Sequence, residues 1–256
     1  MIVDSLTHPT LDELWINGLK GESFKKLSSE MEAFSINHAF VCGLPGVGSY
    51  EHSLFYNKSL LYDCFTPIAA ITKKNLIDIQ NELVQIKTIG FGAVKIHERL
   101  LKIQFNSIEL STIFKTCEDL GLIVYYCTYY CCVPLNMPHE DPFWKLRFVL
   151  EQNPEVKLVL VHGGGVRLLE YAELVRFSKN TILDLSLTLL KYRKSSIDND
   201  IDFLCHNFDR RICLGSDHPE YTIEEFSERV HAITKKLPKK KKDNILGENI
   251  MKFWNI

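Results

Sequence analysis

A carboxylate and an imidazole stand side by side near the end of the chain, where Asp217 and His218 follow the short apolar segment Ile212–Leu214. The segment has the composition of a buried strand, and a Gly-Ser turn separates it from the two side chains. Aspartate and histidine just past the C-terminal end of a strand are placed to bind a metal or to move protons. The simpler interpretation is that the turn only caps the following helix. Two similar strand ends, at His8 and His162, favour the chemical interpretation.

Alternating apolar and helical segments predict the fold that positions these side chains. Near-continuous Val, Ile and Leu runs are typical of parallel strands buried on both faces. We expect strands at 1–4, 38–44, 65–71, 93–97, 122–127, 156–161, 181–187 and 212–214. Helical spacing is found at 11–34, 50–62, 75–86, 108–120, 141–152, 166–177, 200–207, 223–234 and 244–253. This alternation predicts an α/β protein, a single (β/α)8 TIM-type barrel over residues 1–256. A doubly wound open sheet is the alternative, disfavoured because no Gly-x-Gly-x-x-Gly follows the first strand.

The composition is that of an ordinary globular protein, with 46% hydrophobic and 24% charged residues. A formal net charge of -2 argues against nucleic acid as a partner, because phosphate binding usually shows as a basic excess. The basic run 235–242 is interpreted as a solvated loop rather than a patch for nucleic acid or anionic lipid. No stretch reaches the roughly 18 apolar residues of a membrane span. No signal peptide is expected, because the N-terminus lacks a basic segment followed by an apolar core.

The cysteine pattern favours reduced, buried thiols and therefore a cytoplasmic location, because none of the cysteines forms a Cys-x-x-Cys pair. The adjacent pair Cys131 and Cys132 is the exception, in a loop that we interpret as either a lid or a metal site. The eight cysteines are Cys42, Cys64, Cys117, Cys127, Cys131, Cys132, Cys205 and Cys213.

In a parallel barrel the C-terminal ends of the strands share one face, and active sites are assembled there. A histidine after a single strand is more often an ordinary loop or core residue. Several polar side chains at the ends of different strands favour a functional site. Arg211 precedes the last strand and is expected to tie the opposite end of the barrel. The polar side chains expected on the shared face are His8, Lys95, His97, Cys127, His162, Ser186, Asp217 and His218.

The chain resembles the amidohydrolase superfamily, in particular its amidohydrolase-related branch of small metal-dependent hydrolases and decarboxylases. Each matching motif alone is weak, but the motifs occur in the family's order across nearly the whole chain. They are Val3–Pro9, Gly90–His97, Leu158–Gly165, Asp184–Ser186, Arg211–Pro219 and Ile245–Asn249.

The resemblance implies roles at matching positions. The family's first strand gives a His-x-His pair of metal ligands, and here Leu6 stands in the first place and His8 in the second. The usual fifth-strand histidine corresponds to Cys127. His162 matches the sixth-strand histidine, which binds a second metal or acts as acid and base. Asp217 matches the eighth-strand aspartate, a ligand that also takes a proton from the attacking water.

The altered positions leave the metal content open. Leucine cannot bind a metal, whereas a cysteine thiolate can, and a catalytic zinc needs about three protein ligands. His8, Cys127 and Asp217 would supply three ligands to one divalent ion, zinc or manganese. The equal alternative is a metal-free site. Lys95 matches a lysine that is carboxylated and bridges two metals in some relatives, or it serves here as a positive group for a carboxylate or oxyanion.

We expect a small-molecule substrate, acidic in character, bound by Lys95, His97, Arg99 and His218. The simpler interpretation of Glu98 and Arg99 is an exposed loop pair. Packing between barrel and helices is favoured over a sugar or aromatic pocket for the tyrosines around the fifth strand, Tyr125, Tyr126, Tyr129 and Tyr130.

Two functions of different classes are consistent with these residues. The first is hydrolysis of a C–N or C–O bond of an amide, cyclic amide or lactone, with Asp217 as general base and His162 handling charge or the proton. Decarboxylation uses a similar site. The second is a catalytically silent barrel that binds a ligand or partner, since fold analogy does not establish activity. Convergence of His8, His162 and Asp217 around an open centre would favour the enzyme.

Overall fold

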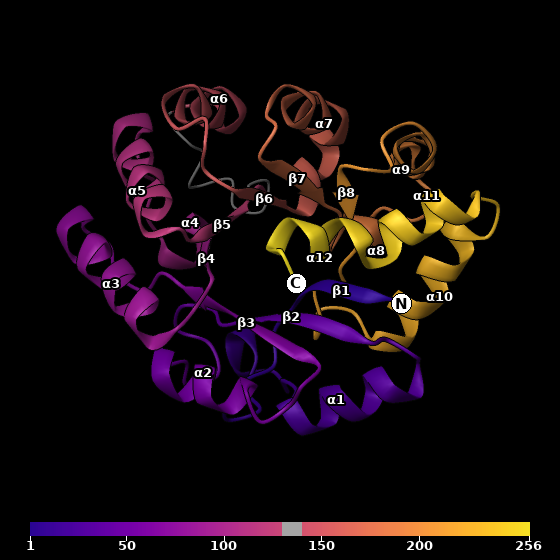
Figure 1. Ribbon diagram of the computed structural model, residues 1–256. Coiled ribbons are helices and arrows are strands. Elements are labelled where there is room, and N and C mark those ends of the chain that lie inside the picture. The colour runs from indigo at the N-terminus through magenta and orange to yellow at the C-terminus, as the bar shows by residue number, and fades with distance from the viewer. Residues whose placement is uncertain (130–139) are drawn as a thin grey trace.

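The computed structural model describes residues 1–129 and 140–256 and shows one ring of eight parallel strands (Figure 1). Neighbouring strands pair in sequence order from β1 to β8. The strands are β1 (Val3–Thr7), β2 (His38–Cys42), β3 (Phe65–Ala70), β4 (Ala93–Ile96), β5 (Ile123–Cys127), β6 (Leu158–Val161), β7 (Thr181–Asp184) and β8 (Ile212–Cys213).

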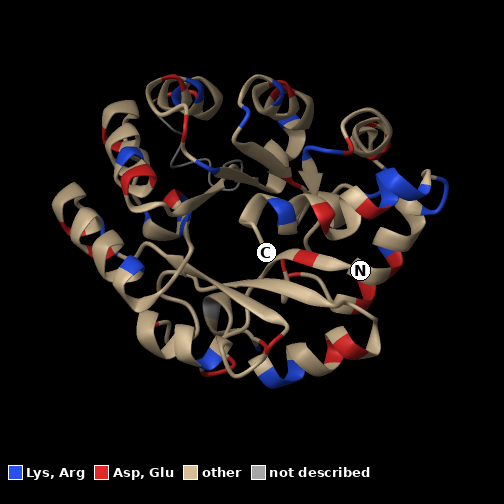
Figure 2. Cartoon of the chain, in the orientation of Figure 1, with Lys and Arg blue, Asp and Glu red and all other residues tan. Residues whose placement is uncertain are grey.

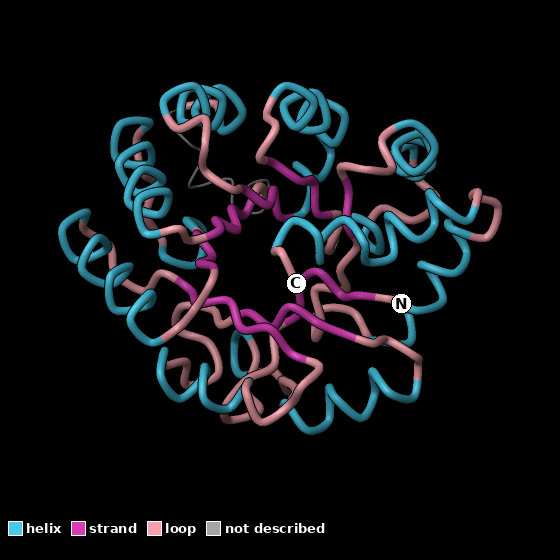
Figure 3. Tube along the Cα trace, viewed as in Figure 1, coloured by secondary structure: helices cyan, strands magenta, loops and turns pink. Residues whose placement is uncertain are grey.

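The strands form a ring inside the helices (Figure 3), and the segment that follows β8 pairs with β1 to complete it. Thr7 and His218 form a parallel bridge, and the Ser5 amide donates to the Leu214 carbonyl at 2.9 Å. The Asp217 amide donates to the Leu6 carbonyl at 3.0 Å. These bonds confirm the predicted TIM-type barrel and exclude the open doubly wound sheet.

Helices surround the barrel, and most of them follow a strand (Figure 1). Side chains cap two of their starts in the same way: Asn106 and Thr222 each form a capping box with the glutamate three residues later. The helices are α1 (Phe24–Ala33), α2 (His52–Ser59), α3 (Leu76–Ile89), α4 (Glu98–Leu101), α5 (Ser107–Leu120), α6 (Pro142–Gln152), α7 (Leu168–Phe177), α8 (Thr188–Lys191), α9 (Ser196–Asn207), α10 (Ile223–Thr234), α11 (Lys239–Asp243) and α12 (Asn249–Trp254). The described residues also contain the irregular helical turns η1 (Ile16–Gly18), η3 (His162–Arg167) and η4 (Asn244–Glu248).

Two apolar layers hold the molecule together. One fills the barrel interior, where Tyr125 is fully buried, and the other lies between strands and helices, where Tyr126 is buried. This alternation follows from side chains pointing to opposite faces along a strand. The C-terminal helix α12 closes one end of the ring, and the Trp254 indole donates to the Tyr125 hydroxyl at 2.9 Å. Arg211 ties the segment before β8 to β7, because its guanidinium donates to the Thr181 carbonyl.

The predicted helix at 11–34 is wrong in its first half. The helix begins only at Phe24, after Ser23 accepts a hydrogen bond from the Lys26 amide as N-cap. Before it, Leu14 and Lys20 form an antiparallel bridge around η1, and Gly18 has a positive φ of 72°. Apolar spacing did not reveal this turn, which a glycine makes at low cost.

Smaller differences concern element ends and the basic run. β1 continues to Thr7, β7 ends at Asp184, and α9 begins at Ser196, since Ser195 caps it. In the basic run, Lys235, Lys236, Lys239 and Lys240 are exposed, whereas Leu237 is buried and Lys241 and Lys242 are half-buried. The run is helical from Lys239 as α11, so the predicted loop is wrong there. Charged residues lie mostly on the outer helices and connections (Figure 2).

The described cysteines are all free thiols, and four of the six are buried. Cys131 and Cys132, with the predicted lid or metal loop, lie outside the described residues. No helix in the described ranges combines the length and apolar character needed to cross a membrane.

Candidate active site

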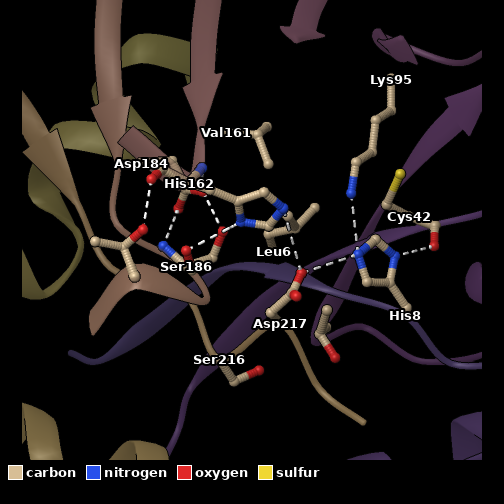
Figure 4. Close-up of polar contacts among 12 residues, drawn as sticks. Leu6, His8, Cys42, Lys95, Val161, His162, Asp184, Ser186, Ser216 and Asp217 are labelled. Atoms are coloured by element: carbon tan, nitrogen blue, oxygen red, sulfur yellow. Dashed lines mark hydrogen bonds and ion pairs between the residues drawn. The ribbon is translucent and has the colours of Figure 1, made fainter. Parts of the chain in front are cut away.

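Asp217 lies at the centre of a buried polar cluster at the C-terminal ends of the strands (Figure 4). Its Oδ1 is 3.4 Å from Nε2 of His8 and 3.9 Å from Nε2 of His162. Only 9% of Asp217 is exposed. His8 and Asp217 come from opposite ends of the sequence, and the closure of β8 on β1 brings them together.

His8 is held between a carbonyl and an ammonium. Its Nδ1 is 2.8 Å from the Cys42 carbonyl, so Nδ1 carries the proton, and Nε2 accepts from Nζ of Lys95 at 3.1 Å. Burial and the charge of Lys95 lower the pKa of His8 to about 4. His8 is therefore neutral near pH 7, and its contact with Asp217 is not an ion pair. The Trp15 ring stacks on the imidazole with centroids 5.8 Å apart.

In contrast to His8, the His162 ring is favoured in its protonated form. Its Nδ1 lies 3.0 Å from the Ser186 carbonyl and 3.0 Å from the Ser186 hydroxyl, so Nδ1 donates and Nε2 faces Asp217. Burial disfavours the charged ring, but the Asp217 carboxylate and Cys127 raise the pKa of His162 above its ordinary value. The Ser186 hydroxyl donates to Asp184, which also accepts from the His162 amide at 3.3 Å. This chain of hydrogen bonds fixes the ring orientation.

The turn after β8 holds Asp217 in an uncommon conformation. Its φ is 58°, a left-handed value that costs a non-glycine residue free energy. Asp4 fixes the turn by accepting from the Ser216 amide at 2.9 Å and from its hydroxyl at 2.6 Å. Gly215 is required by close approach, since a Cβ there would lie 2.8 Å from the Ser186 Cβ.

The electrostatics keep Asp217 ionised. Burial raises the pKa of a carboxyl group, but the positive charges of His162 and Lys95 hold the pKa of Asp217 below its ordinary value. An ionised carboxylate beside a positive imidazole is the arrangement required of a general base with a nearby acid.

Cys127 lies on the His97 and His162 side of the cluster. Burial raises the pKa of a thiol, but these two histidines contact Cys127 and lower its pKa well below the usual value. His97 is buried and caps α4, since its Nδ1 accepts from the Leu100 amide at 3.3 Å. Cys127 thus lies against two imidazoles beside the Asp217 group.

Positive charge lies around the Tyr129 ring. Arg99 and Lys191 are exposed, and their cationic groups lie 5.8 Å and 5.7 Å from the centroid of this ring. Tyr129 itself contacts His162, with ring centroids 6.2 Å apart. These two cations lie on the His162 side of the cluster and favour an anionic ligand.

The structure brings together most, but not all, of the residues predicted from sequence. His8, Lys95, His162 and Asp217 converge, with His97, Cys127 and Arg99 beside them. His218 does not join them, because its imidazole points toward Glu22. Glu98 is not part of an exposed loop pair: it binds Lys145 at 2.9 Å and accepts from the Tyr126 hydroxyl at 3.0 Å. Tyr130 lies outside the described residues.

The predicted metal ligands do not fit a divalent ion in this arrangement. Lys95 occupies the direction from which a metal would approach Nε2 of His8, and a second cation there would be repelled. Within the described ranges, His8, Cys127 and Asp217 do not form a group with ligand atoms within 4.8 Å of one another. Leu6 is fully buried in the barrel interior. Lys95 thus supplies the positive charge at this position.

Sequence reasoning missed the residues that support the site. Asp4 and Asp184 are strand residues with fully buried carboxylates, and Lys191 lies on the short helix α8. An aspartate inside an apolar strand was a usable signal, because an unpaired carboxylate is rarely buried. Nothing in the sequence marked Lys191 or the stacking of Trp15.

Comparisons with known proteins agree with the architecture. A family model described as Amidohydrolase matches residues 80–256. No curated protein matches the chain significantly. An uncharacterised TIM-barrel protein, Bb4693 from Bordetella bronchiseptica, is 18% identical with a TM-score of 0.83, over 99% of this chain and 98% of its own.

Two further similar solved structures have names that state an enzymatic activity. A probable 2-pyrone-4,6-dicarboxylic acid hydrolase from Acinetobacter baumannii, with citric acid bound, is 17% identical with a TM-score of 0.65, covering 100% and 99% of the two chains. The 5-carboxyvanillate decarboxylase from Novosphingobium aromaticivorans, complexed with manganese, is 11% identical with a TM-score of 0.68, covering 100% and 96%. At these identities the likeness shows the shared barrel fold.

Proposed function

The chain belongs to the amidohydrolase family, and from this premise we propose that it hydrolyses a C–O or C–N bond of a small acidic substrate without a metal ion. The observation that carries the proposal is the ionised Asp217 carboxylate placed between His8 and His162 beside the buried Lys95. Family members often bind a divalent metal, and in this proposal Lys95 replaces the metal's positive charge.

The proposed reaction begins with proton transfer to Asp217. As a water oxygen bonds to the substrate carbonyl carbon, the carboxylate takes the water proton and the carbonyl becomes an oxyanion. Lys95 stabilises this oxyanion, because a fixed cation in a buried site interacts strongly with developing charge. The carbon–oxygen or carbon–nitrogen bond to the leaving group then breaks, and the leaving atom takes a proton from Nε2 of His162. The proton on Asp217 returns to His162, which lies 3.9 Å away.

The supporting residues keep these groups in place. Ser186 and Asp184 hold the His162 tautomer, and the Cys42 carbonyl holds that of His8. Arg99 and Lys191 supply positive charge near His162 and favour a substrate with carboxylates. A lactone of a dicarboxylic acid has both the reactive carbonyl and the negative charge that this site favours.

The test is an assay with 2-pyrone-4,6-dicarboxylate and a panel of acidic lactones, cyclic amides and amides. We expect turnover by the wild-type protein and a loss of about a hundredfold to ten-thousandfold in Asp217→Asn. Asp63→Asn, a surface change of the same charge, is the matched control. Retained turnover in Asp217→Asn would refute the assigned base.

The product distinguishes the proposed hydrolysis from the two alternatives. Hydrolysis leaves every substrate carbon in the product, whereas decarboxylation by the same site would release carbon dioxide. Binding of panel members without turnover would favour the silent binding protein, and calorimetry with the same compounds detects it.

A further inference from the structure

A cluster of ligand-type side chains lies beside the candidate active site on its α1 side. Glu22, Glu30 and His218 offer ligand atoms that all lie within 4.8 Å of one another, the only such group within residues 1–129 and 140–256. His218 follows Asp217 directly in the chain, and its imidazole extends to the α1 side of this segment. Helix α1 packs against α10, which follows the segment that carries His218 (Figure 1).

The His218 ring is prepared as a ligand. Its Nδ1 is 3.1 Å from the Tyr221 carbonyl, which can only accept a hydrogen bond, so Nδ1 carries the proton and Nε2 the lone pair. Histidines that bind metals commonly donate their other ring nitrogen to a carbonyl in this way. Only 3% of His218 is exposed, and its Nε2 has no hydrogen-bond partner among the described residues. A buried polar atom without a partner is costly and calls for an unseen one.

The unpartnered nitrogen faces the carboxylates. Nε2 of His218 is 3.7 Å from Oε2 of Glu22, too long for a hydrogen bond but close to the separation of two ligands on one metal. A lone pair facing a carboxylate is unfavourable unless a cation lies between them. Burial lowers the pKa of His218 below its ordinary value, which also keeps the ring neutral.

The Lys26 ammonium group already forms ion pairs with both carboxylates. Its Nζ is 2.6 Å from Glu22 and 3.3 Å from Glu30, because Glu22, which precedes α1, and Lys26 and Glu30 within it are spaced four apart. The Lys26 side chain is 51% exposed, so it can move into solvent at small cost. It neutralises the carboxylates but does not bond to His218.

We propose that Glu22, Glu30 and His218 form a binding site for one divalent transition-metal ion, zinc by its mixed nitrogen and oxygen ligands. One imidazole and two carboxylates make three protein ligands, which leaves a position for water. The ion would displace Lys26 and join α1 to the segment between β8 and α10. This site shares no residue with the cluster of His8, Lys95, His162 and Asp217, so the proposal does not rest on the proposed metal-free reaction.

Calorimetric titration of Zn²⁺ into chelator-treated protein tests the site. We expect one ion per chain, with affinity weakened at least about tenfold in Glu22→Gln and Glu30→Gln. Glu32→Gln, an exposed glutamate on the same helix, is the matched control and should bind as wild type. Lys26→Met should bind more tightly, because the competing ammonium is removed.

Thermal unfolding and a second variant separate this site from the active site. Zinc at about a hundredfold excess over its dissociation constant should raise the Tm of wild type by about 5 to 10 °C, and that of Glu30→Gln much less. Glu30 is half-buried, so Glu30→Gln should fold normally, with circular dichroism as the check. The proposal is overturned if wild type binds no zinc at millimolar concentration, or if binding survives in Glu30→Gln and is lost in Cys127→Ser.

Discussion

Asp4 links the stability of the fold to the position of the candidate base. The carboxylate is fully buried on β1 and accepts from the amide and hydroxyl of Ser216, next to Asp217. Burial outweighs these hydrogen bonds and raises the pKa of Asp4 from 3.8 to about 7. The folded protein therefore binds a proton here that the unfolded chain has released above about pH 4.

This pKa difference sets a direction and a magnitude for the stability. Because the folded state binds more protons, the Asp4 contribution to the free energy of unfolding falls as the pH rises from about 4 to about 7. The full loss is about 4 kcal/mol, at about 1.4 kcal/mol for each tenfold change in the acid dissociation constant. About 3 kcal/mol of it falls between about pH 5 and about pH 8.

Asp4→Asn removes the titrating group and keeps its shape. The asparagine Oδ1 still accepts from the Ser216 amide, and its Nδ2 donates to the Ser216 hydroxyl. Urea unfolding of wild type and Asp4→Asn at about pH 5 and about pH 8 should show the variant gaining about 3 kcal/mol relative to wild type at the higher pH. Asp63→Asn controls for the change in net charge. An equal difference between wild type and Asp4→Asn at both pH values would refute the reasoning.

Three further substitutions test the supporting contacts. Gly215→Ala should lower the free energy of unfolding by about 1 to 3 kcal/mol and also lower turnover, since the new Cβ lies 2.8 Å from the Ser186 Cβ. Urea unfolding that matches wild type would contradict this prediction. Lys145→Met should lower the free energy of unfolding by about 3 to 5 kcal/mol, because it leaves the largely buried Glu98 carboxylate without its cation. Thermal or urea unfolding measures this loss. Lys95→Met should raise the pKa of His8 above about 4, measured by NMR titration of the ring, and an unchanged pKa would show that Lys95 does not set the charge of His8.

The barrel and its functional face could be predicted from sequence because both follow from one periodic pattern. Apolar runs separated by helical spacing predict parallel strands, and parallel strands place their C-terminal ends together. His8, His162 and Asp217 were therefore expected to share a face. The sequence did not predict the distances between these three side chains, because the distances depend on how the segment after β8 pairs with β1.

Side-chain direction in irregular backbone could not be predicted. Asp217 and His218 are adjacent, yet the positive φ of Asp217 turns one side chain into the site and the other toward α1. On β1 the pairing with β2 shifts register between Asp4 and Thr7, so Leu6 faces the interior together with Val3, three residues earlier. Regular alternation does not predict this. The partner of Lys95 likewise depends on the ring tautomer of His8, which the Cys42 carbonyl determines.

The most direct test of the account is the rate of hydrolysis of an acidic lactone by protein freed of metal with a chelator. If Lys95 and Asp217 carry the reaction, the chelated protein should retain the turnover of untreated protein, and Lys95→Met and Asp217→Asn should each lose it. Turnover that disappears on chelation and returns with zinc or manganese would contradict the proposal that Lys95 takes the place of the metal.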